Sequence, residues 1–181
     1  MIKYTRKVLI ASGDSWTFYT RYTHPFWPEI LANKLDMKCI NIGRGGKGNE
    51  FIYNQMIDKL CTTKRIGLAV CLWSEVGRWD FPYLEASSKI DNDGNVIRGV
   101  IKKYKLLKSM RWYHAFQNHC ELHNIKYLQM QAFHSLRGQP TKELLDSAQF
   151  NFIDDNKFIG WPPYEQLGGK TAWNKLDDVD P

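Results

Sequence analysis

The stretch KVLIASGDS, residues 7–15, decides the fold class of this chain. It opens with a short, mainly apolar run of the kind that forms a strand buried on both faces of a sheet. Gly13 ends the run, and the polar residues Asp14 and Ser15 follow at once. A strand that ends in this way carries polar groups to the edge of a sheet, where the ligand sites of open α/β proteins lie.

The same pattern recurs further along the chain. Apolar runs at 37–42 and 67–73 predict a second and a third strand, and apolar residues at helical spacing predict helices at 26–35 and 50–60, the latter capped by Asn49. Alternating strands and helices imply parallel strands joined by right-handed crossovers, with helices on both faces of the sheet. We therefore predict an α/β fold with strand order 2-1-3-4, which a fifth strand can extend.

The second half of the chain is less regular. Residues 79–100 contain a proline and the turn-forming run DNDGN, which indicates an insertion or a mobile loop. A long helix is expected at 101–124, a fourth strand at 125–133 and a short helix at 141–149. A chain of 181 residues suits one domain, so we expect a single domain over residues 1–181.

The composition excludes several classes of protein. With 43% hydrophobic and 24% charged residues, the chain resembles a soluble globular protein that needs neither disulfides nor a structural metal to hold its core. No apolar run reaches the length of a membrane-spanning helix, and the run at 8–11 is too short for a signal peptide. We therefore expect a cytoplasmic protein with reduced cysteines and no membrane partner.

Two further features could suggest other partners. The net charge of +6 gathers in residues 98–126, but a solvated helix face gives the same pattern, and no nucleic-acid motif accompanies it. His119 and His123 share a helix face, yet the His-Glu-x-x-His order of zinc enzymes is absent. We therefore predict neither a nucleic-acid partner nor a metal site.

Three polar motifs follow three of the predicted strands. They are Gly13-Asp14-Ser15, the glycine-rich loop 43–49 and Trp73-Ser74-Glu75. The carboxyl ends of parallel strands meet at one edge of a sheet, so motifs far apart in the sequence converge there. We expect Ser15, Gly46 and Ser74 to lie within about one small-ligand diameter of each other.

Ser15 is the strongest candidate for a chemical role. A serine just past a strand and near a helix N-terminus presents its hydroxyl at the sheet edge, where backbone N–H groups stabilise the negative charge that develops during acyl transfer. The structural alternative is that Asp14 and Ser15 only form a turn and a helix cap, as such residues often do.

The loop NIGRGGKGN, residues 41–49, supports a site at this edge because glycine lets the backbone approach a ligand and direct N–H groups at it. It is not a P-loop, since Lys47 is followed by Gly48 and not by Ser or Thr. Glycines 43, 45 and 48 formally match a dinucleotide fingerprint, but they follow the second strand and lack the ribose-binding acid. No nucleotide cofactor is therefore predicted.

The motifs together resemble those of the SGNH (GDSL-type) hydrolases. Gly13-Asp14-Ser15 is similar to the first block of that family, which carries the nucleophilic serine, and Asn41-Ile42-Gly43-x-x-Gly46 is similar to the second, whose last glycine supplies an oxyanion-hole N–H. The order and spacing fit over roughly residues 7–135. The resemblance implies a three-layer α/β/α sandwich with a flavodoxin-like parallel sheet.

The third block departs from the family pattern. Leu72-Trp73-Ser74-Glu75 stands where Gly-x-Asn-Asp is expected, so Ser74 replaces the asparagine that donates to the oxyanion. Ser74 or Asn49 could supply this donor instead. Arg78 could bind an anionic group of the substrate or form an ion pair with Glu75.

The fourth element of the family, Asp-x-x-His, has no counterpart because no histidine follows residue 134. A serine hydroxyl needs a base to attack at neutral pH. His134, after the predicted fourth strand, is the expected substitute, with His24 as an alternative, and Asp180 or Asp178 is the expected orienting acid. We expect the chain to stop short of this block, which would bare part of a sheet face and favour a homo-oligomer.

The resemblance thus implies a serine esterase or acylhydrolase, without metal or cofactor, that acts on an ester of a carbohydrate, a lipid or a small acyl donor. Its expected catalytic groups are Ser15, Gly46, Asn49, Ser74, His134 and Asp180, and its expected substrate contacts are Asp14, Trp16, Trp73, Glu75 and Arg78. The alternative is a non-catalytic module on the same fold that binds a glycan or another ligand, which the missing histidine favours.

Overall fold

The computed structural model describes residues 6–18, 25–76, 78, 80, 95–132 and 150–159, with the backbone alone at 95–103, 150 and 155. Its centre is a sheet of five parallel strands, in the order β2-β1-β3-β4-β5. The strands are β1 (Val8–Gly13), β2 (Lys38–Asn41), β3 (Ile66–Trp73), β4 (Tyr127–Gln131) and β5 (Phe158–Ile159). The predicted order is confirmed, and the fifth strand extends it at the β4 edge.

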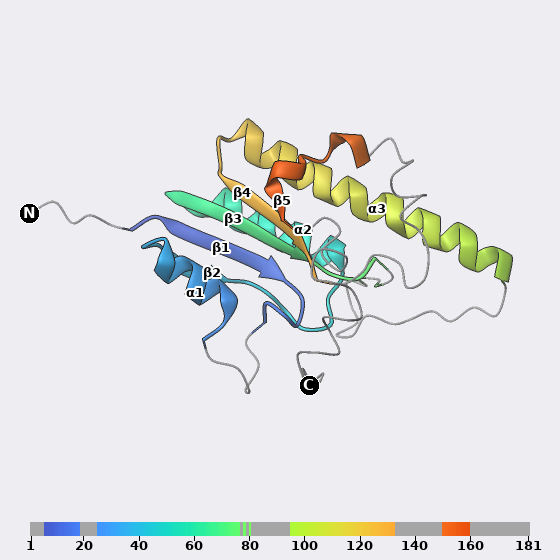
Figure 1. Cartoon of the computed structure of the whole chain (residues 1–181), viewed down its shortest axis with the longest axis horizontal. Helices are drawn as coiled ribbons and strands as arrows, with labels where there is room; N and C mark the ends of the chain where they lie inside the picture. Colours follow the sequence, from blue (N-terminus) through green and yellow to red (C-terminus); the bar gives the residue numbers. More distant parts are fainter. Residues whose placement is uncertain are drawn as a thin grey trace, which may run out of the picture.

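Helices cover both faces of this sheet, as Figure 1 shows. On one face lies α1 (Trp27–Lys34). Pro28 stands in its first turn, where the N–H that proline lacks would have no acceptor within the helix. On the other lie α2 (Asn49–Thr62) and α3 (Asn95–Leu122), and the short 3-10 helices η1 (Phe150–Phe152) and η2 (Asp155–Lys157) lead into β5. The α/β/α sandwich is therefore as predicted.

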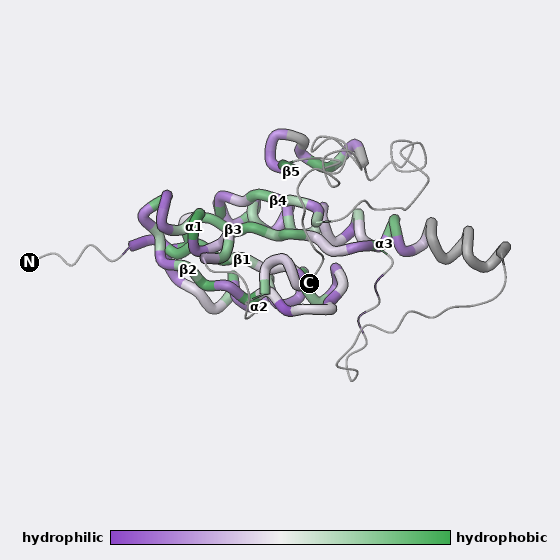
Figure 2. Tube along the Cα trace, turned by 60° about the horizontal axis from the view of Figure 1, so that its bottom comes forward, coloured by the Kyte–Doolittle hydropathy of each residue, from purple (hydrophilic) through white to green (hydrophobic). Residues whose placement is uncertain are grey.

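The main core lies between the sheet and the pair α2 and α3. Figure 2 shows β3 as a largely hydrophobic trace between its neighbours, which suits a central strand. Trp73, at the end of β3, is fully buried against Tyr113 and Phe116 of α3, with ring centroids 4.7 and 6.0 Å from its own. These aromatic contacts fix how α3 crosses the end of the sheet where the polar motifs lie.

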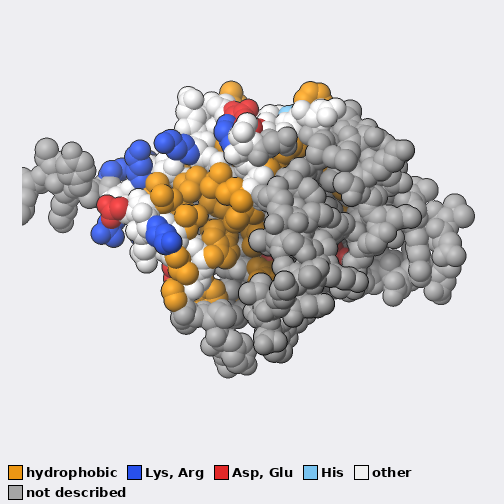
Figure 3. Space-filling model, in the orientation of Figure 1, with side chains coloured by type: hydrophobic (Ala, Val, Ile, Leu, Met, Phe, Trp, Pro, Cys, Tyr) orange, Lys and Arg blue, Asp and Glu red, His pale blue; other side chains and the backbone are white. Residues whose placement is uncertain are grey.

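The opposite face of the sheet has a smaller buried cluster. Leu9, Ala11 and Ala32 form its centre, and partly buried side chains such as Leu68 and Met37 surround them. Figure 3 shows hydrophobic side chains gathered on this face, with lysine and arginine beside them. The expected homo-oligomer stays a prediction.

The largest difference between the predicted and the observed helix boundaries is at the start of α3. α3 begins at Asn95 and not at residue 101, so part of the predicted insertion at 79–100 is helical. Asn95 is the last residue of the turn-forming run DNDGN, and the helix starts at this residue. No helix in the described part of the chain has the length and apolar character needed to cross a membrane. The short helix expected at 141–149 lies outside the described residues.

Candidate active site

Ser15 is the first residue of a tight turn that follows β1. The backbone carbonyl of Asp14 accepts hydrogen bonds from the N–H groups of Thr17 (3.0 Å) and Phe18 (2.9 Å), which makes a single helical turn. The Asp14 carboxylate accepts the N–H of Trp16 at 3.0 Å and so caps that turn. Ser15 itself is exposed, and its side chain is therefore accessible at the carboxyl edge of the sheet.

Two glycines leave room for Thr17, a buried residue of this turn. Thr17 is fully buried, and a Cβ atom added to Gly13 would lie only 2.1 Å from its Oγ1. A Cβ atom added to Gly43 would lie 2.7 Å from the Thr17 Cβ and 2.9 Å from its backbone carbonyl carbon. Neither position has room for a side chain, so the last residue of β1 and the second residue after β2 must be glycine for Thr17 to be buried here.

The glycine loop after β2 lies beside Ser15. A Cβ atom added to Gly45 would be 3.9 Å from the Cβ of Ser15, and the N–H of Arg44 donates to the carbonyl of Gly13 at 2.9 Å. Gly46 has φ +75°, a left-handed conformation that favours glycine. The structure thus places the loop that carries Gly46 against the residue predicted to be the nucleophile.

Ser74 and Asn49 belong to a buried polar network. The Ser74 hydroxyl donates to Oδ2 of Asp14 at 2.9 Å, and its N–H donates to Oδ1 of Asn49 at 2.7 Å. The Asn49 amide nitrogen donates to Ser109 Oγ (3.1 Å) and to the Tyr113 hydroxyl (3.2 Å). Both side chains are buried, and these bonds direct their donors toward other protein groups.

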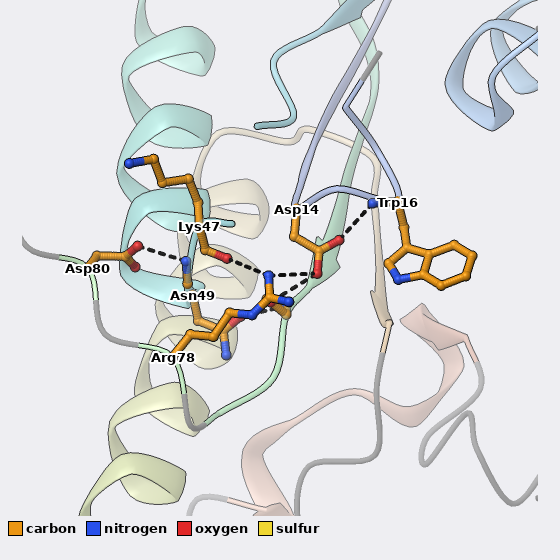
Figure 4. A network of polar contacts seen from close by, with 8 residues as sticks. Asp14, Trp16, Lys47, Asn49, Arg78 and Asp80 are labelled. Carbon is orange, nitrogen blue, oxygen red and sulfur yellow. Dashed lines mark hydrogen bonds and ion pairs between the residues drawn. The ribbon is translucent and has the colours of Figure 1, made fainter. Parts of the chain in front are cut away.

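Arg78 joins the serine turn to the glycine loop, as Figure 4 shows. Its Nη1 lies 3.5 Å from Oδ2 of Asp14 and 3.5 Å from the carbonyl oxygen of Lys47. Arg78 thus forms an ion pair with Asp14. Its side chain keeps 21% of its surface exposed, so the guanidinium also reaches solvent at the site.

Burial sets the charge balance of Asp14. The carboxylate has no exposed surface, and burial raises its pKa above the ordinary value. The N–H of Trp16, the hydroxyl of Ser74 and the charge of Arg78 act in the opposite direction because they stabilise the ionised form.

Asp80 is a functional neighbour that the sequence analysis missed. Its Oδ1 accepts the N–H of Gly48 at 2.7 Å and its Oδ2 accepts the N–H of Phe51 at 2.9 Å, so it satisfies two orphan donors at the start of α2. The prediction that Asn49 caps this helix is wrong: Gly48 is the N-cap residue, and the Asn49 side chain is drawn into the buried network. Nothing in the local sequence indicates a cap supplied from 32 residues away.

Comparison with solved structures identifies proteins with this architecture. A mutant of the esterase AlinE4 has a TM-score of 0.56 at 13% identity, over 97% of this chain and 85% of that chain. The chain has the SGNH-hydrolase fold. AlinE4 itself, described as an SGNH-hydrolase family esterase, gives a TM-score of 0.50 at 16% identity, over 97% and 86% of the two chains. A protein of the G-D-S-L family from Desulfitobacterium hafniense DCB-2 gives a TM-score of 0.48 at 16% identity, over 96% of this chain and 75% of that chain.

The resemblance drawn from the motifs is therefore confirmed at the level of the fold. No family model matches the chain, and comparison with curated proteins finds no match.

Of the other predicted site residues, three lie in the described part of the chain and four lie outside it. Trp16 lies beside Ser15 and is 41% exposed, whereas Trp73 is fully buried and donates its indole N–H to Oε1 of Gln129 at 2.8 Å. Glu75 is half-buried after β3, and its charge partly opposes the burial that lowers the pKa of Lys105. His24, His134, Asp178 and Asp180 lie outside the described residues.

Three histidines are described, and all lie on α3. His114 stacks on Phe152 with ring centroids 5.4 Å apart. The ring centroids of His119 and His123 lie 4.6 Å apart. The ring of His114 thus contacts η1, and the rings of His119 and His123 contact each other.

The steric fit around Thr17 leads to a stability experiment. Gly43→Ala should lower the free energy of unfolding by about 1–3 kcal/mol because the added methyl group overlaps Thr17. Gly45→Ala is the matched control, since its methyl group would meet neighbours at 3.8 and 3.9 Å, and we expect a change within about 0.5 kcal/mol. Urea unfolding measures both, and equal losses would contradict the packing described above.

The raised pKa of Asp14 leads to a pH experiment. The folded state holds the Asp14 proton more tightly than the unfolded state does. The contribution of Asp14 to the free energy of unfolding must therefore fall as the pH rises from the pKa of the unfolded state to the higher pKa of the folded state. The free energy of unfolding of the natural chain, minus that of Asp14→Asn, should therefore decrease from pH 4 to pH 7. The decrease should be about 1.4 kcal/mol for each pH unit by which the pKa is raised. A difference that grows with pH would show that Arg78 outweighs burial.

Proposed function

We propose that this chain is an esterase or acylhydrolase with Ser15 as its nucleophile. The observation that carries the proposal is the exposed position of Ser15 at the start of a capped turn, beside the Gly45-Gly46 loop, on a fold shared with esterases. A backbone that is held from both sides presents a hydroxyl with little freedom to move, which is what nucleophilic catalysis requires.

The proposed reaction begins when Ser15 Oγ attacks the carbonyl carbon of an ester and passes its proton to a base. The carbonyl oxygen becomes an oxyanion, which the N–H groups of Ser15 and Gly46 stabilise by hydrogen bonds. The base then protonates the departing alcohol, leaving an acyl group on Ser15. Water, deprotonated by the same base, attacks this acyl-enzyme and releases the acid.

We propose His134 as the base, with Asp180 as the acid that orients it. His134 follows β4 in the sequence, and the carboxyl end of β4 lies at the same edge of the sheet as Ser15. The three histidines of α3 are poorer candidates, since His114 stacks on Phe152 and the rings of His119 and His123 contact each other.

The surroundings of Ser15 support a small-molecule or glycan ester as substrate. Trp16 and Phe18 follow Ser15 in the same turn and expose 41% and 40% of their surfaces, and exposed aromatic rings stack on apolar groups and on sugar rings. The partly exposed guanidinium of Arg78 would interact with an anionic group of the same substrate. A cytoplasmic location is part of this proposal.

A non-catalytic binding module is the second candidate. Ser74 stands where the family carries an oxyanion donor, but its hydroxyl donates to Asp14, and the Asn49 amide donates to Ser109 and Tyr113. A site with fewer oxyanion donors stabilises the transition state less, while the aromatic side chains would still bind a glycan.

Labelling with a fluorophosphonate tests the nucleophile. The natural chain should be labelled at Ser15, and Ser15→Ala should abolish labelling while the melting temperature stays within a degree or two, because the side chain is exposed. Thr62→Ala, which removes an exposed hydroxyl of α2, is the control and should be labelled normally. Labelling that survives in Ser15→Ala would exclude Ser15, and a natural chain that resists labelling would favour the binding module.

Substitution of His134 tests the base. His134→Ala should lower the labelling rate and the hydrolysis of a short-chain aryl ester by about 10²–10⁴-fold, the usual contribution of a general base. His114→Ala is the matched control and should retain both rates, since His114 stacks on Phe152. Unchanged rates in His134→Ala would exclude His134 as the base, and His24→Ala would then be measured in the same way.

A further inference from the structure

The side chain of Asn41, at the end of β2, joins the two loops of the candidate site. Its amide nitrogen donates to the backbone carbonyl of Thr17 at 2.6 Å, and its Oδ1 accepts the N–H of Gly43 at 2.9 Å. Thr17 belongs to the turn that carries Ser15, and Gly43 begins the loop that carries Gly46. The proposed reaction assigns no role to Asn41.

Among the described residues, two backbone hydrogen bonds join these loops at their roots. The N–H of Ile42 donates to Ala11 at 2.8 Å and the N–H of Arg44 donates to Gly13 at 2.9 Å, which continues the pairing of β2 with β1. The hydrogen bond from Asn41 is made to Thr17, which lies further from the end of β1, in the turn that carries Ser15. It therefore restrains the turn against rotation about the end of β1, a motion that the bonds at the roots would permit.

We propose that Asn41 is a positioning residue that sets the separation of Ser15 Oγ from the Gly46 N–H. This inference rests on the proposed function, because the separation matters only if the two groups act on one carbonyl. Reacting groups must be held to within about half an ångström of the productive geometry, so a small rotation of the turn has a large effect on rate.

The role requires an amide. One end of the side chain must donate to a carbonyl and the other must accept from an N–H, and asparagine combines both functions at the length that spans these loops. Aspartate has the same shape but only accepts, so Asn41→Asp would place a carboxylate oxygen against the Thr17 carbonyl. The turn would have to move away from β2.

Gln117 provides a matched control within the same chain. Its amide nitrogen donates to the carbonyl of Phe152 at 3.1 Å, and its Oε1 accepts the N–H of Asp154 at 3.0 Å. It therefore makes the same kind of two-bond bridge, between α3 and the segment that leads into β5. Gln117→Glu makes the same chemical change without touching either loop of the candidate site.

The first measurement is the rate of fluorophosphonate labelling of Ser15 in the full chain, together with kcat and KM for a short-chain aryl ester. Asn41→Asp should lower the labelling rate and kcat by about 10²-fold with little change in KM, because the lost alignment affects the transition state more than substrate binding. Gln117→Glu should lose stability but keep both rates. Equal rate losses in the two variants, or none in Asn41→Asp, would overturn the proposal.

The second measurement does not depend on activity. Amide hydrogen exchange should accelerate at Thr17, Phe18 and Gly43 in Asn41→Asp, and only near Asp154 in Gln117→Glu, because each variant releases its own bridge. Unchanged exchange at the first three amides would overturn the proposal even if the natural chain is not labelled. Accelerated exchange in a chain that is not labelled would show that Asn41 holds the loops while Ser15 is not a nucleophile, which separates the two hypotheses.

Discussion

The carboxylate of Asp14 is the group on which the candidate site depends. It has no exposed surface, and a buried carboxylate must be hydrogen-bonded or paired to be tolerated. Its partners come from the serine turn, from the end of β3 and from the segment after β3, through the Trp16 N–H, the Ser74 hydroxyl and Arg78. Because these groups lie on separate parts of the chain, satisfying one carboxylate also assembles the edge of the sheet.

This arrangement gives a physical account of the polar residues at and after the end of β3. At position 74 a serine is short enough to donate to Asp14, while its own N–H is held by Asn49. Asn49 is in turn held by Ser109 and Tyr113, and burial raises the pKa of the Tyr113 hydroxyl, so this group stays neutral. Ser74 and Asn49 thus form a buried scaffold that holds the Asp14 carboxylate of the serine turn.

The fold could be predicted because short stretches of sequence are enough to indicate its first three strands. Each of the first three strands is an apolar run next to a glycine or a turn, and β1, β2 and β3 lie within one or two residues of their predicted positions. The edge of the sheet that carries Ser15 follows from parallel pairing alone. The start of α3 at Asn95 was missed because Asn95 ends the run DNDGN, whose composition favours a turn over a helix.

The fine structure of the site could not be predicted in the same way. The cap of α2 comes from Asp80, the partner of Arg78 is Asp14, and the support for the serine turn comes from Asn41, each through a contact between distant parts of the sequence. Asn49 illustrates the cause, since its composition suits a helix cap, yet the three groups it meets in the core outweigh that local preference.

Arg78 and Asp80 stand two residues apart in the sequence and hold the two sides of one peptide group. Arg78 approaches the carbonyl oxygen of Lys47 at 3.5 Å, and the Asp80 carboxylate accepts the N–H of Gly48, which belongs to the same peptide group, at 2.7 Å. Asp80 also accepts the N–H of Phe51 in the first turn of α2. Because a peptide group is planar, it cannot turn away from one of these two side chains without disturbing its contact with the other.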